Sequence, residues 1–251
     1  GRLSDPSSLN AAVRHVYVVY HVAAKVSDWG SLESFRKINV EGTRHLLDAS
    51  RKAGVKRVVF ISSVAVHAFA GGQDMDENAP QQPNPFPYGI SKQEAESLVL
   101  SYNNPPEFET TVIRPGDVFG PGDRTSLLKM KAMLLKGQML LLDRGKTLGA
   151  FTYVENLADG IILAGNHPNA PGEAFIITDG IKLTWKSYFK RLTEVLDLPE
   201  PKGSIPGWLA QLIAELLEFI YKTFGLKRRA PVTKYLIAHL RHDVHFSIHK
   251  A

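Results

Sequence analysis

The chain has 251 residues, 44% of them hydrophobic and 22% charged, which is enough apolar material for one core and a smaller lobe. It has no cysteine, so disulfides and thiolate chemistry are excluded and a reducing compartment is compatible. The formal net charge of +5 comes from basic residues that are scattered except at 227–229, so we expect no nucleic-acid binding. Neither a secretory leader nor an uncharged apolar run of about 18 residues is expected, which favours a cytoplasmic protein without a membrane span.

Two apolar runs and the segment between them predict a parallel βαβ unit. Residues 16–22 form a continuous apolar run that is typical of a buried parallel strand. A helical stretch from 31 to 53 follows and ends at a glycine. The second apolar run, 57–63, delivers the hydroxyls of Ser62 and Ser63 to the carboxyl end of a strand, where ligands bind in open α/β sheets.

The next segment, 88–92 (Tyr-Gly-Ile-Ser-Lys), carries a tyrosine and a lysine that share one face of a helix. A phenol titrates near ~10. A nearby ammonium lowers that pKa, which lets Tyr88 exchange protons at neutral pH with the help of Lys92. The spacing alone is common on surface helices, but Ser63 lies 25 residues upstream at the end of the predicted strand. Serine, tyrosine and lysine so arranged indicate a proton-relay oxidoreductase.

The remaining segments are assigned in chain order. The polar, proline-rich segment 71–87 is expected to be a loop that walls a substrate cleft. Residues 110–116 predict a third strand, and the glycine- and proline-rich segment 115–122 predicts the loop after it. Residues 174–180 predict a last strand that returns to the sheet. The rest of the chain, from 123 onward, is expected to form a small helical lobe over the carboxyl ends of the strands.

One stretch of that lobe, 207–225, has apolar residues at helical spacing, with Gln211, Glu215, Glu218 and Lys222 on the opposite face. Aromatic residues stand at both ends of the apolar stripe, and the basic cluster follows directly. These features fit a helix that lies in a membrane interface. A helix packed on its own domain is the alternative, and the sequence leaves both open.

Four histidines near the end of the chain have spacings of three, three and four residues, at positions His239, His242, His245 and His249. Residues 244–248 alternate like a strand, and no cysteine accompanies the histidines. We therefore expect solvated histidines and no metal site.

Six segments resemble, in order, the extended short-chain dehydrogenases/reductases, the superfamily of NAD-dependent epimerases and dehydratases. The matching segments are 21–24, 39–43, 60–63, 88–92, 113–123 and 151–156. The loop 24–30 and the apolar lobe most resemble the branch of 3β-hydroxysteroid dehydrogenases and sterol-4α-carboxylate 3-dehydrogenases.

The resemblance implies an α/β fold: a partial Rossmann-like, doubly wound parallel sheet in residues 1–122 and a mostly helical substrate lobe in 123–251. The glycine-rich turn that holds the cofactor pyrophosphate in this superfamily is expected to be absent from the chain. We accordingly expect the chain by itself to be poorly stable and inactive.

The resemblance also implies roles for individual residues. Tyr88 takes the proton of a secondary alcohol, Lys92 assists it, and Ser63 hydrogen-bonds the substrate oxygen, with Ser62 as its substitute. Asn39 resembles an asparagine that organises the proton relay; a polar surface residue is the other interpretation. NAD, favoured over NADP, is the implied cofactor. The residues implied to hold it are His21, Ala23, Ala24, Ile61, Ser62, Tyr88, Lys92, Pro115 and Val118.

The implied substrate is a hydrophobic secondary alcohol: a steroid, a sterol or a long-chain β-hydroxy acid. A nucleotide-sugar epimerase or dehydratase uses the same three residues and is the alternative, for which Lys186 and Arg191 are the cations available to a diphosphate. A second alternative is a non-catalytic fragment or binding protein. Relatives often form homodimers through helices that correspond to 31–53 and 88–102.

Overall fold

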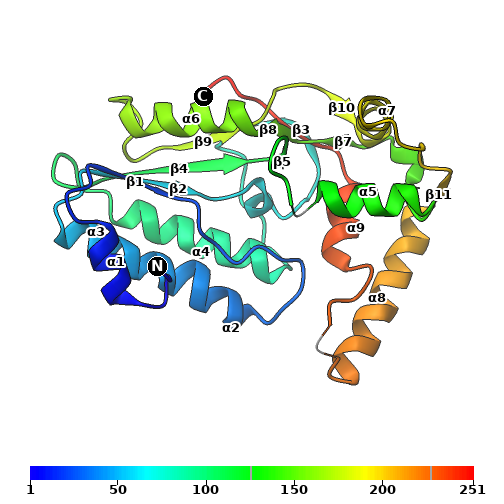
Figure 1. Ribbon diagram of the computed structural model, residues 1–251, viewed down its shortest axis with the longest axis horizontal. Coiled ribbons are helices and arrows are strands. Elements are labelled where there is room, and N and C mark those ends of the chain that lie inside the picture. The colour runs from blue at the N-terminus through cyan, green and yellow to red at the C-terminus, as the bar shows by residue number, and fades with distance from the viewer. Residues whose placement is uncertain (125, 227) are drawn as a thin grey trace.

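The centre of the molecule is a parallel sheet with helices on both faces, seen edge-on in the computed structural model of Figure 1. The structure describes residues 1–124, 126–226 and 228–251. The sheet order is β1 (Val18–His21), β2 (Arg57–Ile61), β4 (Glu109–Pro115) and β9 (Ala174–Ile177). The predicted α/β class with a doubly wound parallel sheet is confirmed.

Strand β2 shows why these strands are continuous apolar runs. Val58 and Phe60 pack with the helices of one face, whereas Val59 and Ile61 pack with the helix α6 (Val154–Asn166) of the other. Since successive side chains point to opposite faces, both sets must be apolar in a sheet that is covered twice. All five residues of β2 are buried.

The predicted helix 31–53 is one helical segment with an unusual middle. It consists of α2 (Leu32–Phe35), the six-residue π-helical turn η1 (Arg36–Glu41) and α3 (Gly42–Lys52). Gly54, at φ +74°, ends the segment as predicted. Such π-helical turns occur frequently at functional sites. This one contains Asn39, which is buried, so the interpretation of Asn39 as a surface residue is wrong.

Two segments predicted as loops contain strands. Within 71–87, β3 (Gly72–Met75) pairs with β12 (Val244–Phe246), and within 115–122, β5 (Asp117–Phe119) pairs with β8 (Phe151–Tyr153). Their partners lie far away in the sequence, so local composition could not indicate the pairing. Gly116 permits the second one, because a Cβ on it would lie 1.9 Å from the Ala150 carbonyl oxygen.

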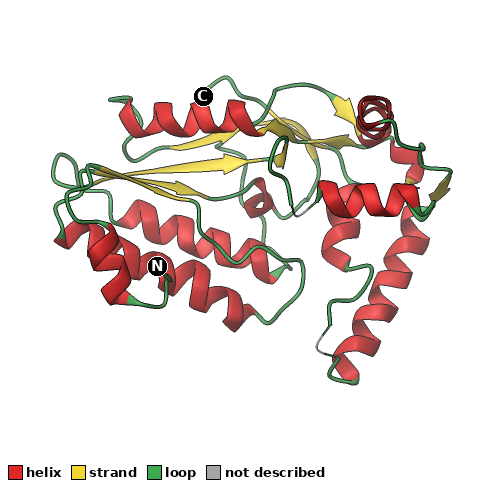
Figure 2. Cartoon of the chain, in the orientation of Figure 1, coloured by secondary structure: helices red, strands yellow, loops and turns green. Residues whose placement is uncertain are grey.

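The other helices and short strands complete the two sides of the molecule (Figure 2). They are α1 (Pro6–Ala12), η2 (Val64–His67), α4 (Pro87–Ser101), α5 (Leu127–Leu135), β6 (Leu140–Leu142), η3 (Asp143–Gly145), β7 (Leu148–Gly149), β10 (Leu183–Thr184), α7 (Trp185–Leu196), β11 (Gly203–Ile205), α8 (Gly207–Thr223) and α9 (Lys234–Arg241). Helices α3 and α4 cover one face of the sheet (Figure 1). α6 covers the other face, and α5, α7, α8 and α9 lie beyond the carboxyl ends of the strands (Figure 1).

Helix α8 exposes the apolar stripe that the sequence predicts. Trp208 is 64% exposed, Phe219 66% and Phe224, directly after the helix, 73%. The residues that α8 buries are Gly207, Ala210, Ala214 and Glu218. Lys227 of the adjoining basic cluster lies outside the described residues, and Arg229 pairs with Asp28. Within the described chain, no helix is both long and apolar enough to span a membrane.

Candidate functional site

A cavity of about 540 Å³ opens where the parallel strands end. Ser62 and Ser63, which follow β2, line it together with Pro115 at the end of β4. α4 brings Tyr88 and Lys92 to the same cavity. The structure therefore brings together the serine, the tyrosine and the lysine that the sequence singled out.

Tyr88 lies in the first turn of α4 because the helix starts at Pro87. Asn84 fixes that start: its side chain donates to the Ala65 carbonyl and accepts from the Phe86 amide. A hydrogen bond joins Tyr88 to Ser63, which acts to lower the pKa of the phenol, but burial outweighs it and raises that pKa to about 12. The phenol thus keeps its proton at neutral pH, contrary to what the spacing with Lys92 suggests.

Lys92 is almost fully buried one turn further along α4. Its Nζ donates to the Ile61 carbonyl oxygen at 2.7 Å and lies 4.9 Å from the Phe60 ring centroid and 6.0 Å from that of Tyr88. Burial lowers the pKa of Lys92 to about 8, although the Glu96 carboxylate opposes the shift. The ammonium can therefore change its protonation state near physiological pH.

Asn39 connects the π-helical turn to two neighbours of the site. Its Oδ1 accepts from the Lys25 amide at 2.7 Å, and its Nδ2 donates to the Lys25 carbonyl and to Ser91 Oγ. The loop after β1 and the helix α4 are thereby held together. The role of Asn39 in proton transfer stays a prediction.

A buried ion pair that the sequence analysis missed lies beneath the site. Glu96 accepts hydrogen bonds from Arg114, from Ser62 Oγ at 2.8 Å and from Gln81. Ser62 is thus committed to a carboxylate, which makes Ser63 the better placed of the two serines. An available signal was the spacing of four between Lys92 and Glu96, which places both on the buried face of α4.

The residues implied to hold the cofactor divide into two groups. Ala24, Ile61, Ser62, Pro115 and Val118 line the cavity together with Tyr88 and Lys92. His21 and Ala23 are not among the residues that line it. His21 is instead buried against α3, where its Nε2 contacts Thr43 Oγ1 at 2.8 Å. Burial and the Lys92 charge lower the pKa of His21 to about 4, so the ring is neutral. Whether these residues hold a cofactor stays a prediction.

Two of the four histidines, His239 and His245, are not solvated, so the expectation is wrong for these two; His242 and His249 are exposed as expected. His245 lies in β12, beside Asp74, because β12 pairs with β3. His239 lies in α9 and its Nε2 is 3.0 Å from a carboxylate oxygen of Asp117, inside the same cavity as Tyr88. Among the described residues, no group of three or more His, Cys, Asp or Glu side chains is placed to hold a metal ion.

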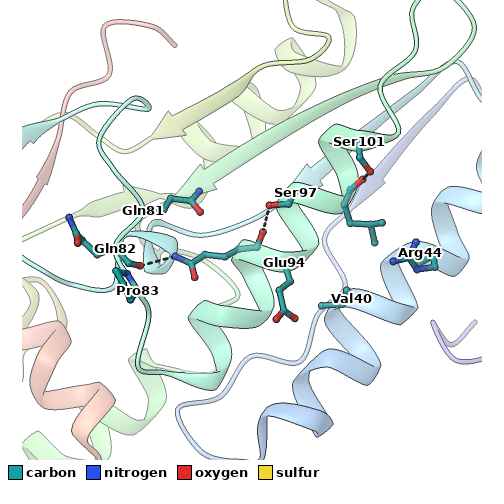
Figure 3. A pocket seen from close by; sticks show the side chains of 10 residues that line it. Val40, Arg44, Gln81, Gln82, Pro83, Glu94, Ser97 and Ser101 are labelled. Carbon is teal, nitrogen blue, oxygen red and sulfur yellow. Dashed lines mark hydrogen bonds between the residues drawn. The ribbon is translucent and has the colours of Figure 1, made fainter.

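Two further hollows adjoin these elements. One, of about 750 Å³, shares Tyr88 and Tyr235 with the first cavity and is lined by the 27–31 loop, α8 and α9. The other, of about 770 Å³, lies between the outer side of α4 and the 81–83 segment, where Figure 3 shows Gln81, Glu94 and Ser97. It contains none of Ser63, Tyr88 and Lys92, so despite its size it is not the candidate catalytic site.

A doubly wound parallel sheet with serine, tyrosine and lysine at its carboxyl ends defines the class of short-chain dehydrogenases/reductases. The sequence model of the 3-beta hydroxysteroid dehydrogenase/isomerase family matches residues 1–206. The chain belongs to this family, as its motifs predict.

Individual relatives agree with this assignment. The chain is 30% identical over 255 residues to a 4-hydroxy-2-methyl-3-oxo-4-farnesyl-3,4-dihydroquinoline-1-oxide ketoreductase of Stigmatella aurantiaca, covering 100% of the chain and 75% of the relative. It is 32% identical to a 3 beta-hydroxysteroid dehydrogenase/Delta 5→4-isomerase of Mycobacterium tuberculosis, with 100% and 71% covered. It is 31% identical to the mouse sterol-4-alpha-carboxylate 3-dehydrogenase, decarboxylating, with 88% and 63% covered. Two relatives from Arabidopsis thaliana are covered over only 42% and 50% of their length.

Solved structures show the same fold. The crystal structure of gox2253 superposes with a TM-score of 0.76 at 27% identity, covering 100% of this chain and 76% of that one. MoeE5 in complex with UDP-glucose and NAD superposes with a TM-score of 0.70 at 20% identity, with 96% and 83% covered. The predicted Rossmann-like architecture is confirmed.

Proposed function

We propose that the protein is an oxidoreductase that interconverts a hydrophobic secondary alcohol and its ketone with NAD as cofactor. The observation that carries the proposal is the placement of Ser63, Tyr88 and Lys92 around one cavity with apolar walls. Membership of the 3-beta hydroxysteroid dehydrogenase/isomerase family supports it.

The residues present fit the nicotinamide end of such a cofactor. Lys92 has three N–H donors and gives one to Ile61, which leaves donors for ribose hydroxyls at the cavity wall. Pro115 and Val118 supply an apolar wall for a flat ring. When bound, the nicotinamide supplies the hydride chemistry. NAD in the similarly folded MoeE5 supports the capacity of the fold for this group.

The proton chemistry follows from the pKa values of the two side chains. A phenol with its pKa raised to about 12 holds a proton that it can donate to a ketone oxygen as the carbinol forms. In the oxidative direction the same oxygen takes the alcohol proton. The Lys92 ammonium favours the transient phenolate, and the Ser63 hydroxyl hydrogen-bonds the substrate oxygen.

A hydrophobic substrate matches the lobe side of the cavity, where Phe119, Phe151 and Trp185 form the wall. The names of the relatives, which include sterol, hydroxysteroid and farnesyl-quinoline compounds, agree with a large apolar substrate. We include steroids, sterols and long-chain β-hydroxy acids, and a role in steroid biosynthesis, in the proposal.

The decisive experiment replaces Tyr88 in the full-length protein. Tyr88→Phe removes the transferable proton and keeps the ring, so turnover of a 3β-hydroxysteroid should fall by at least about 100-fold. Cofactor affinity should stay unchanged, because Lys92 and the cavity walls remain. The exposed Tyr17→Phe is the matched control and should leave both quantities unchanged. A Tyr88→Phe enzyme that keeps its turnover would contradict the proposal.

We further propose that α8 rests on a membrane interface. Its outward face carries Trp208, Leu212 and Phe219, and the exposed cations Lys222 and Arg228 stand near its end. An exposed apolar face beside cations suits the boundary of an anionic lipid layer. A cytoplasmic protein that is associated peripherally with membranes remains our prediction, as does the homodimer through 31–53 and 88–102.

The epimerase alternative is less well supported. Lys186 and Arg191 on α7 are exposed, and Arg191 pairs with Glu194 at the surface. Neither cation lines the cavity that contains Tyr88. Release of free NADH during turnover separates the dehydrogenase from an epimerase, which keeps its cofactor. A non-catalytic binding protein would show neither reaction.

A further inference from the structure

The catalytic cavity has a second polar end that the proposed proton chemistry does not use. Trp185 at the start of α7 and His239 in α9 both line the cavity, and their rings are 5.7 Å apart. The indole Nε1 of Trp185 and the imidazole Nδ1 of His239 are buried, and neither has a hydrogen-bond partner within the described residues. A buried polar atom without a partner costs about 1–3 kcal/mol, so two of them in side chains that line one cavity point to a missing ligand group.

The orientation of His239 is fixed by its other nitrogen. Nε2 faces the Asp117 carboxylate, which belongs to β5 and comes two residues after Pro115. The ring is also held by Phe69, at 4.7 Å between centroids, and by Tyr235, at 6.4 Å. Because Nε2 donates to Asp117, any further ligand of the ring must use Nδ1.

The charge state decides what Nδ1 offers. Burial disfavours the imidazolium, but the Asp117 charge and hydrogen bond outweigh burial, and the pKa of His239 is raised. In the imidazolium form Nδ1 carries a proton and donates. The indole Nε1 of Trp185 can only donate. With His239 as the imidazolium, both orphaned atoms are donors, and an acceptor oxygen, such as that of a carbonyl, carboxylate or ether, satisfies both.

We propose that Trp185 and His239 form a subsite for an acceptor oxygen at the end of the substrate opposite to the reacting carbinol. Asp117 is a positioning residue that holds the imidazole. The subsite rests on the proposed function and narrows its substrate class to molecules with two oxygen functions on an apolar body. Tyr235 is a neighbour of both ends, with its ring 6.3 Å from Tyr88 and 6.4 Å from His239.

A pair of substrates tests the subsite in the full-length protein. One is a 3β-hydroxysteroid with a ketone on the ring farthest from the hydroxyl, and the other is the same steroid without that ketone. Wild-type kcat/KM should be at least about 10-fold higher for the ketone, since a lost hydrogen bond at a buried donor has an effect of this size. His239→Phe and Trp185→Phe should each lower the ratio of the two kcat/KM values to about 1, because the donor that the ketone needs is gone.

The exposed His249→Phe and Trp208→Phe are matched controls and should keep the preference. Asp117→Asn should weaken the preference and change its pH dependence, because the remaining amide no longer favours the imidazolium. Equal kcat/KM for the two steroids in the wild type, or a preference that survives both cavity substitutions, would overturn the subsite. Turnover that survives Tyr88→Phe would contradict the proposed proton chemistry, whereas equal kcat/KM for the two steroids would contradict only the subsite, so the two failures are distinguishable.

A binding measurement covers the case in which neither steroid turns over. The indole N–H resonance of Trp185, identified by its loss in Trp185→Phe, should shift when the ketone steroid is added and shift less with the ketone-free steroid. The same shift with both steroids would mean that the indole reports contact with the apolar body, and it would contradict an acceptor subsite.

Discussion

Helices α4 and α8 both bury polar side chains, but α8 leaves its large apolar side chains exposed. α4 turns Tyr88, Lys92 and Glu96 inward against the sheet, whereas α8 turns large apolar residues outward and buries small ones and Glu218. In α4 each inward polar group has a partner, such as Ile61 for Lys92 and Arg114 for Glu96. A helix can therefore bury a polar side chain when that side chain has a hydrogen-bond or ion-pair partner inside the protein.

The same rule explains Glu218 on α8. Its carboxylate accepts from the Lys234 amide at the start of α9 and from Lys222 on its own helix. The buried polar residue of α8 is thereby paired within the molecule, whereas Trp208, Leu212 and Phe219 face outward. Substitutions on the buried and exposed faces of the two helices test this difference.

The largest stability effect is expected for the buried pair under α4. Glu96→Ala leaves the Arg114 guanidinium buried without its carboxylate and should lower the free energy of unfolding by about 3–5 kcal/mol. Urea denaturation of the full-length protein measures this. Glu94→Ala, two residues away, removes only the exposed pair with Arg36 and should cost at most about 1 kcal/mol. Equal losses in the two variants would show that burial of the pair does not matter.

An intermediate effect concerns Lys92 and depends on pH. Its pKa is lowered from 10.5 to about 8 in the folded protein, so between these values the unfolded chain binds more protons. Stability of the wild type relative to Lys92→Met should therefore rise with pH, by about 2–3 kcal/mol between pH 7 and 10. Below pH 8 the full burial penalty remains, so the inactive Lys92→Met variant should be the more stable protein there. If the free energy of unfolding of the two proteins changed with pH in the same way, the lowered pKa of Lys92 would be contradicted.

The smallest stability effect is expected on the outer face of α8. Leu216→Ser and Phe219→Ser together should change the free energy of unfolding by less than about 1 kcal/mol, since both side chains are exposed. The same pair should weaken binding to vesicles of anionic phospholipid by at least about 10-fold, because apolar area is lost from the interface.

An inward substitution on the same helix is the control for α8. Ala214 is fully buried, and Ala214→Leu should destabilise by about 1–3 kcal/mol through overpacking while it leaves the vesicle-facing side chains in place. Unchanged vesicle binding in Leu216→Ser/Phe219→Ser would remove the membrane proposal and leave the fold unaffected.

The parallel sheet and the Ser63, Tyr88 and Lys92 end of the site can be predicted from local sequence patterns. Residues 58–61 are all apolar, so both faces of this strand carry apolar side chains, as a strand that is covered on both sides requires. The residues Tyr88 and Lys92 share a helix face by spacing alone, and the strand before them ends at Ser63, so their meeting followed from local rules.

The remaining strand pairings and side-chain contacts depend on the tertiary structure. The pairings β3 with β12 and β5 with β8, and the contacts of Glu96 with Arg114 and of Asp117 with His239, join segments whose local composition says nothing about their partners. Periodicity showed that α8 has an apolar stripe but could not show which way the stripe faces. The direction in which the stripe faces depends on the packing and hydrogen-bond partners of the opposite face. Those partners come from other segments, such as the Lys234 amide of α9 for Glu218.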